Sequence, residues 1–218
     1  MSRKNKTNLY VAIGAFVAFI IWTALVCVID VKPIGPEGSQ VGFATFNGFI
    51  HRLTGVNMWL YEISDWLGLV PIAVAFMFAS LGLTQWIKRK SILKVDRSII
   101  ALGGFYVVVA AVYLFFELAV INYRPVLIEG ILEASYPSST TVLVACVMLT
   151  AIMQLRQRIK NRALKLCAIK AIAVFIVLML VGRLISGVHW ASDIIGGVLI
   201  STSLVSTYAW VLGFITLK

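Results

Sequence analysis

Six long, predominantly apolar stretches constrain this chain more than any other feature of its sequence. A helix needs about 20 consecutive apolar residues to cross the hydrocarbon core of a bilayer. The stretches lie near residues 9–29, 67–87, 98–120, 138–155, 168–188 and 192–217. They predict an all-α, polytopic integral membrane protein with six transmembrane helices, in which residues 1–218 form a single membrane domain.

The composition supports lipid as part of the solvent of this chain. Of its 218 residues, 61% are hydrophobic and only 13% are charged. A soluble domain of similar size carries about 25% charged residues. One water-soluble core could not bury so many apolar side chains, so we expect the lipid bilayer itself to be a partner of this protein.

The basic residues form short blocks between the apolar stretches, which indicates a membrane orientation. With the N-terminus inside, 15 of the 19 Lys and Arg residues fall on the inner side, but of the nine acidic residues only Asp96 does. The positive-inside rule then predicts cytoplasmic termini for a multi-pass protein of the cell (plasma) membrane. No basic stripe interleaved with aromatic residues is present, so no nucleic-acid partner is expected. The inner basic residues lie in segments 1–8, 88–97 and 156–170 and at Lys218.

The segment between the first two spans, residues 30–66, has apolar residues at nearly helical spacing, such as Phe46, Phe49 and Leu53. This spacing predicts a helical segment with one apolar face. It fits an interfacial helix in the headgroup layer or a cap packed over the helix bundle. His51 lies in this segment, and its role stays open.

Ionisable residues beside membrane spans are costly, so those on the outer side need a reason. His189 and Asp193 are four residues apart and share one face if that segment is helical. A carboxylate that holds one ring nitrogen makes the other nitrogen a better nucleophile. Arg183 and Arg124 carry planar cationic groups suited to phosphate oxygens. The set predicts a phosphoryl-transfer site; the alternative is a group of helix-end charges that pair with one another.

The same residues occur in a recognisable pattern. Gly182-Arg183, His189 and Asp193 are separated by five and three residues. This resembles the third signature of the type 2 phosphatidic acid phosphatase (PAP2) superfamily, Ser-Arg-x5-His-x3-Asp.

Two upstream motifs extend the resemblance from about residue 100 to the C-terminus. Glu117, six further residues and Arg124-Pro125 resemble the first signature, Lys-x6-Arg-Pro. Pro137-Ser138-Ser139-Thr140 stands where the family has Pro-Ser-Gly-His. The order, the spacing and the six spans all resemble the family.

The resemblance implies a lipid phosphatase without metal or other cofactor, acting on a phosphorylated membrane lipid at the extracytoplasmic face. On that pattern His189 attacks phosphorus to form a phosphohistidine intermediate, and Asp193 orients the ring. The phosphoryl oxygens would be held by Arg124, Arg183, Ser138 and Ser139.

Two departures from the signatures bear on the substrate. Glu117 replaces a lysine, and could pair with Arg124 or another basic group, or serve as an acid. Thr140 replaces the histidine that protonates the leaving group, and a hydroxyl is too weak an acid for this near neutral pH. A lipid monophosphate leaves readily without protonation, so we expect a lipid diphosphate such as an isoprenyl pyrophosphate.

Two other functions stay open: a catalytically impaired PAP2-like protein that binds or moves a phosphorylated lipid, and a phosphatidate or phosphatidylglycerophosphate-type monoester phosphatase. A transporter or channel is disfavoured because the spans carry few ionisable residues. The pairs Gly103-Gly104 and Gly196-Gly197 are instead expected to permit close packing of helices. The oligomeric state is not predicted.

Overall fold

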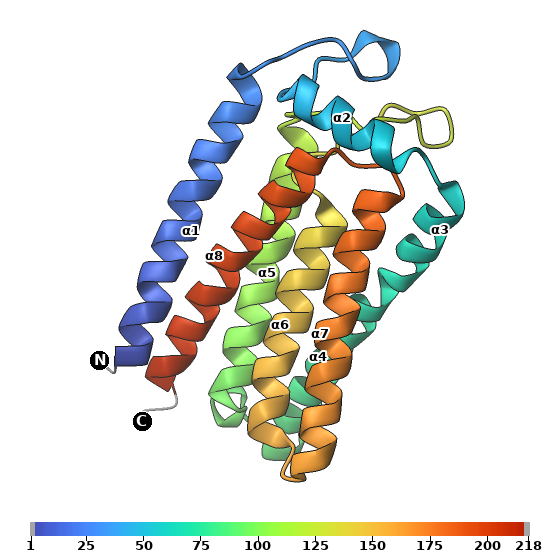
Figure 1. Ribbon diagram of the computed structural model, residues 1–218. Coiled ribbons are helices and arrows are strands. Elements are labelled where there is room, and N and C mark those ends of the chain that lie inside the picture. Colours follow the sequence, from blue (N-terminus) through green and yellow to red (C-terminus); the bar gives the residue numbers. More distant parts are fainter. Residues whose placement is uncertain (1–2, 216–218) are drawn as a thin grey trace.

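All six predicted spans are present as long helices in the computed structural model, which describes residues 3–215 (Figure 1). Two shorter helices, α2 (Ala44–Thr54) and α3 (Met58–Leu67), lie between the first two spans. The end of the sixth predicted span and Lys218 lie outside the described residues. The long helices are α1 (Arg3–Val28), α4 (Leu69–Arg89), α5 (Arg97–Leu118), α6 (Ser139–Arg158), α7 (Arg162–Ile185) and α8 (Ala191–Ile215).

Helix α3 runs into α4 with only Gly68 between them. Together they form one apolar helical stretch, Met58–Arg89, of 32 residues. The helical stretch that contains the second predicted span therefore begins before residue 67, and its first part, α3, carries polar side chains to the bundle.

The short, Ser- and Thr-rich fourth span, α6, is the central helix of the bundle. It contacts α4, α5, α7 and α8, and 61% of its apolar window is buried, whereas α7 buries 6% of its own. Because α6 faces protein rather than lipid, its polar groups find partners. Gln154 donates to the Ser98 carbonyl at 3.2 Å and to the Tyr208 hydroxyl at 2.5 Å.

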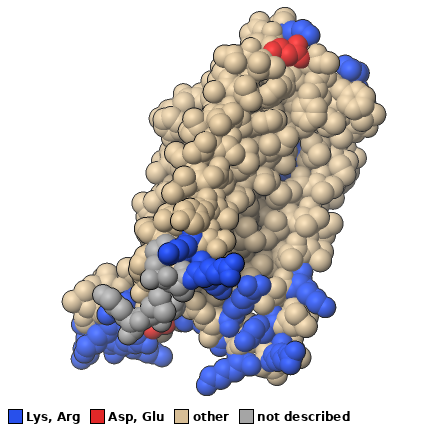
Figure 2. All heavy atoms as spheres, turned by 60° about the vertical axis from the view of Figure 1, so that its left-hand side comes forward, with Lys and Arg blue, Asp and Glu red and all other residues tan. Residues whose placement is uncertain are grey.

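The two ends of the bundle differ in charge. The described residues of segments 3–6, 88–97 and 156–170 gather Lys and Arg at one end, here called the basic end (Figure 2). The other end, here called the site end, carries α2, the α5–α6 loop and the α7–α8 loop (Figure 1). The helix sides between the two ends are almost free of charged side chains in this view, as a lipid-facing surface requires (Figure 2).

Helix α2 lies across the site end as a cap (Figure 1). Its buried Asn47 accepts a hydrogen bond from the Ser192 backbone N–H at 3.0 Å, at the start of α8. The Asn47 amide donates to the Gly42 carbonyl at 2.7 Å. The expected helical segment is thus confirmed, and these contacts hold α2 over the end of the bundle. Its opposite face exposes Phe49 and Leu53, which also suits contact with a membrane surface.

The two glycine pairs have opposite roles. A Cβ on Gly196 would lie 2.6 Å from the Tyr136 ring, and one on Gly197 would lie 2.9 Å from Thr141. These two positions confirm the predicted close packing. A Cβ on Gly103 or Gly104 would meet no atom within 4 Å. The packing interpretation of that pair is wrong, because the missing side chains leave grooves on the surface of α5.

Gly196→Ala should therefore destabilise the protein by about 1–3 kcal/mol through overpacking against Tyr136. Gly104→Ala is the matched control, and its free energy of unfolding should stay within about 1 kcal/mol of wild type or rise, because alanine favours the helix. Unfolding in a mixed-micelle denaturation series measures both. Equal stability of the two variants would contradict the packing difference.

Candidate active site

Residues far apart in the sequence meet at the site end through backbone hydrogen bonds. The Ser138 N–H donates to the Asp193 carbonyl at 3.1 Å, which joins the start of α6 to the start of α8. The Ser135 N–H donates to the Asn122 carbonyl at 2.9 Å across the α5–α6 loop. The Trp190 indole donates to the Tyr123 carbonyl at 2.7 Å. All three signature regions are thereby held in one place.

His189 and Asp193 lie close together, but a third side chain mediates between them. The distance from His189 Nδ1 to Asp193 Oδ2 is 3.9 Å. The Ser135 hydroxyl donates to Asp193 Oδ2 and lies 3.5 Å from His189 Nδ1. Asp193 also accepts from the Trp190 N–H at 2.9 Å and from Asn122 Nδ2 at 3.2 Å. In this arrangement the carboxylate orients the ring through Ser135 rather than by the predicted direct bond.

Nitrogen atoms without hydrogen-bond partners on His189, Arg124 and Arg183 form a candidate anion site. His189 Nε2, Arg124 Nη1 and Arg183 Nη1 are buried and have no hydrogen-bond partner among the described residues. Both guanidinium groups lie over the Tyr61 ring, at 5.9 Å for Arg124 and 5.1 Å for Arg183. Buried cationic donors without partners are costly, and an oxyanion would satisfy them.

Each arginine also contacts a carboxylate through one of its other nitrogen atoms. Arg183 Nη2 lies 2.8 Å from Asp65 Oδ1 and donates to the Thr140 hydroxyl at 2.6 Å. Arg124 Nε lies 3.0 Å from Glu133 Oε2. Of the roles left open for Glu117, a pair with Arg124 is therefore not the one observed. The carboxylates hold the arginines in place while their remaining N–H groups stay open.

The second signature lies at the first turn of α6. The buried Ser138 hydroxyl caps the helix by accepting from the Thr141 N–H at 3.4 Å, which leaves its own O–H available as a donor. Ser139 and Thr140 occupy the first two helical positions. Backbone N–H groups there have no partner within the helix and favour anions.

Glu117 lies exposed on α5, below the second signature. With Ser135 and Ser139 it lines a small cavity beside the Pro137 turn. Its carboxylate makes no ion pair with the described residues.

Sequence reasoning missed Tyr61, Asp65, Asn122 and Ser135, which lie outside the three signatures. One signal was available for two of them: Tyr61 and Asp65 are four residues apart and share one face of α3. Asn122 and Ser135 gave no such signal, because their role depends on how the α5–α6 loop folds over Asp193.

His51, whose role the sequence left open, positions the α7–α8 loop. Its Nε2 lies 3.1 Å from the Gly187 carbonyl, and its ring packs on Trp190 with 5.4 Å between the centroids. Gly187 has a φ of +68°, and a Cβ there would lie 1.9 Å from the Gly55 carbonyl. Only glycine fits where the α2–α3 connection crosses this loop.

Burial lowers the pKa of His189 from 6.5 to about 4. The charges of Arg124 and Arg183 also lower this pKa, whereas Asp193 raises it. The ring is therefore neutral at pH 7, which is the nucleophilic form.

Among residues 3–215, no cluster of three or more His, Cys, Asp or Glu side chains is arranged to hold a metal ion.

The second half of the chain matches a known protein family. The sequence model of the PAP2 superfamily matches residues 115–215, which contain all three signatures. The PAP2 resemblance is confirmed. The PAP2 region thus begins just before Glu117 and includes α6, α7 and α8, whereas Tyr61 and Asp65 lie outside it.

The fold is also similar to a solved PAP2 structure. The crystal structure of a transmembrane PAP2-type phosphatidylglycerolphosphate phosphatase from Bacillus subtilis superposes with a TM-score of 0.60 at 18% identity. The match covers 96% of this chain and 98% of that one. No curated protein sequence matches this chain.

The titration of His189 can be measured directly in protein with labelled imidazole rings, since the chain has only two histidines. We expect a midpoint near pH 4, so that the ring takes up its proton only well below the range of an exposed histidine. His189→Gln assigns the signal by removing it. A midpoint at or above 6.5 would contradict the buried, unprotonated state.

Proposed function

We propose that this protein is a membrane lipid phosphatase that uses His189 to cleave a lipid diphosphate, such as an isoprenyl pyrophosphate. The observation that carries the proposal is the unpaired His189 Nε2 beside the open N–H groups of Arg124 and Arg183. The PAP2 match over residues 115–215 supports the same assignment.

The first step is an in-line displacement at the terminal phosphorus. His189 Nε2 forms a bond to phosphorus as the bridging P–O bond breaks, and the lipid monophosphate leaves with the electron pair. The open nitrogens of Arg124 and Arg183 and the N–H groups at the start of α6 stabilise the charge on the equatorial oxygens. The Ser135 and Asp193 network orients the ring that becomes cationic.

The second step, hydrolysis of the phosphohistidine, needs a base for the attacking water, and we assign this role to Asp65. Asp65 and Thr140 contact the same nitrogen of Arg183, so a carboxylate lies beside the position where the family has its acid–base histidine. The Asp65 side chain is 60% exposed and therefore open to water. It takes one proton from the water as the oxygen bonds to phosphorus and the P–N bond breaks, which releases inorganic phosphate and neutral His189.

The nature of the leaving group favours the diphosphate. Thr140 accepts a hydrogen bond from Arg183 and supplies no acid for an alkoxide. The structurally similar protein from Bacillus subtilis is a phosphatidylglycerolphosphate phosphatase, so a monoester substrate is the second candidate.

We propose that the active site faces the outside of the plasma membrane and that both termini are cytoplasmic. The support is the charge distribution, with 14 of the 18 described Lys and Arg residues on the side opposite to the site. The substrate would then enter from the outer leaflet.

Inorganic phosphate release by the purified protein tests the function. Wild type should cleave isoprenyl diphosphate faster than phosphatidate or phosphatidylglycerophosphate. His189→Ala should lower the rate by about 10³-fold or more, because the nucleophile is lost. Arg52→Gln, a loss of charge on the exposed face of α2, is the control and should retain activity.

Two results would contradict the proposal. Faster cleavage of the monoesters would overturn the diphosphate assignment. Wild type that binds these lipids without releasing phosphate would support the non-catalytic lipid-binding alternative.

Asp65→Asn should slow the second step more than the first. We expect kcat to fall by about 10²-fold or more, as for loss of a general base, and acid-labile phosphohistidine on His189 to accumulate. Glu62→Gln, on the same helix, is the matched control. An unchanged kcat with no accumulation would assign Asp65 to the placement of Arg183 alone.

A further inference from the structure

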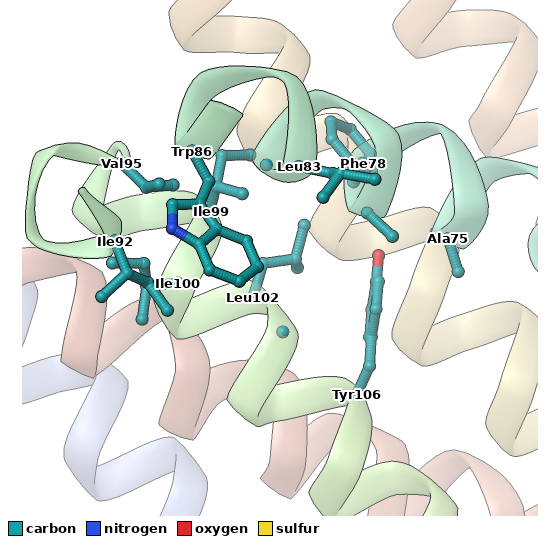
Figure 3. Close-up of a pocket in the computed structure, with 13 residues that line it drawn as sticks. Ala75, Phe78, Leu83, Trp86, Ile92, Val95, Ile99, Ile100, Leu102 and Tyr106 are labelled. Carbon is teal, nitrogen blue, oxygen red and sulfur yellow. The ribbon is translucent and has the colours of Figure 1, made fainter. Parts of the chain in front are cut away.

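A groove opens between α4 and α5 near the basic end, away from the candidate active site (Figure 3). Its volume is about 310 Å³. Trp86 and Tyr106 flank it, and Ile92 and Val95 from the α4–α5 connection close its end (Figure 3). The side chains that line it are apolar apart from the Trp86 indole nitrogen and the Tyr106 hydroxyl, which is 3.3 Å from the Thr150 hydroxyl.

We propose that this groove binds one acyl chain of an anionic phospholipid from the leaflet at the basic end. The proposal is independent of the phosphatase activity.

The length of the groove fits one leaflet. Its lining on α4 extends from Ala75 to Trp86. At a rise of 1.5 Å per residue this is about 16 Å along the helix. Half of a hydrocarbon core of about 30 Å is about 15 Å. An acyl chain lying along α4 would thus reach from the headgroup layer to the middle of the bilayer.

The charge at the mouth fits an anionic headgroup. Lys88, Lys90 and Arg97 flank the apolar residues that close the groove and make no ion pair with described residues. Their neighbour Arg89 is instead bound to Asp96. Each unpaired Lys or Arg side chain near the membrane surface strengthens the binding of anionic lipid by about fivefold. Trp86, close to these charges, suits the membrane–water interface.

Glycine keeps the groove open. Gly103 lines it, and a Cβ at that position would meet nothing within 4 Å. Leucine is therefore accommodated by the backbone, and its side chain would fill the space that the acyl chain needs. Gly104, the next residue, lines a different groove between α5 and α8. The two adjacent glycines supply a matched pair of variants.

The test measures retained lipid by native mass spectrometry, after the protein is purified from vesicles of phosphatidylglycerol and phosphatidylcholine. Wild type should retain phosphatidylglycerol in preference to phosphatidylcholine. Gly103→Leu, and Ala79→Phe from the facing helix, should lose that lipid, whereas Gly104→Leu should keep it. Lys88→Gln should weaken retention by about fivefold. Thermal unfolding checks that each variant is folded.

Three results would overturn the proposal. Equal loss in Gly103→Leu and Gly104→Leu would indicate unspecific lipid around the bundle. Equal retention of both lipids by wild type would remove the role of charge. A dimer of wild type that Gly103→Leu dissociates would assign the groove to a second copy of this chain.

Discussion

The hydrogen bonds of the buried Asp193 carboxylate hold the site end together. It accepts hydrogen bonds from Ser135 and Asn122 of the α5–α6 loop and from the Trp190 N–H before α8. An anion in such an environment is tolerable only because several donors surround it. The same hydrogen bonds also hold the α5–α6 loop in place, and this loop carries Arg124. The same network positions the ring of His189 through Ser135.

The two arginines illustrate how buried cations can be paired and still keep open donors. Each has a carboxylate on one edge, Glu133 for Arg124 and Asp65 for Arg183, and unpaired N–H groups on the other. The ion pairs offset part of the cost of burying cations, and the open donors keep the preference for an oxyanion. The Tyr61 ring under both guanidinium groups adds a weaker attraction and sets their orientation.

Polar residues within the spans follow the same physical rule. Helix α6 is the most polar span and the most buried, and Gln154 there bonds to neighbouring helices instead of facing lipid. Lipid offers no partner for an amide, so such residues collect at the centre of the bundle. The lipid-facing helices are apolar, and the surface of α5 is shaped by the absence of side chains at Gly103 and Gly104.

The sequence alone determined the six spans, the segregation of charge and the three signatures, because hydrophobic length, charge counting and residue spacing are local properties. The tertiary structure decided which groups touch. It paired Arg124 with Glu133 and not with Glu117, inserted Ser135 between His189 and Asp193, and brought Asp65 from outside the PAP2 region to Arg183. Contacts between segments more than 100 residues apart, such as Asp65 with Arg183, depend on helix packing and loop closure, which no local pattern encodes.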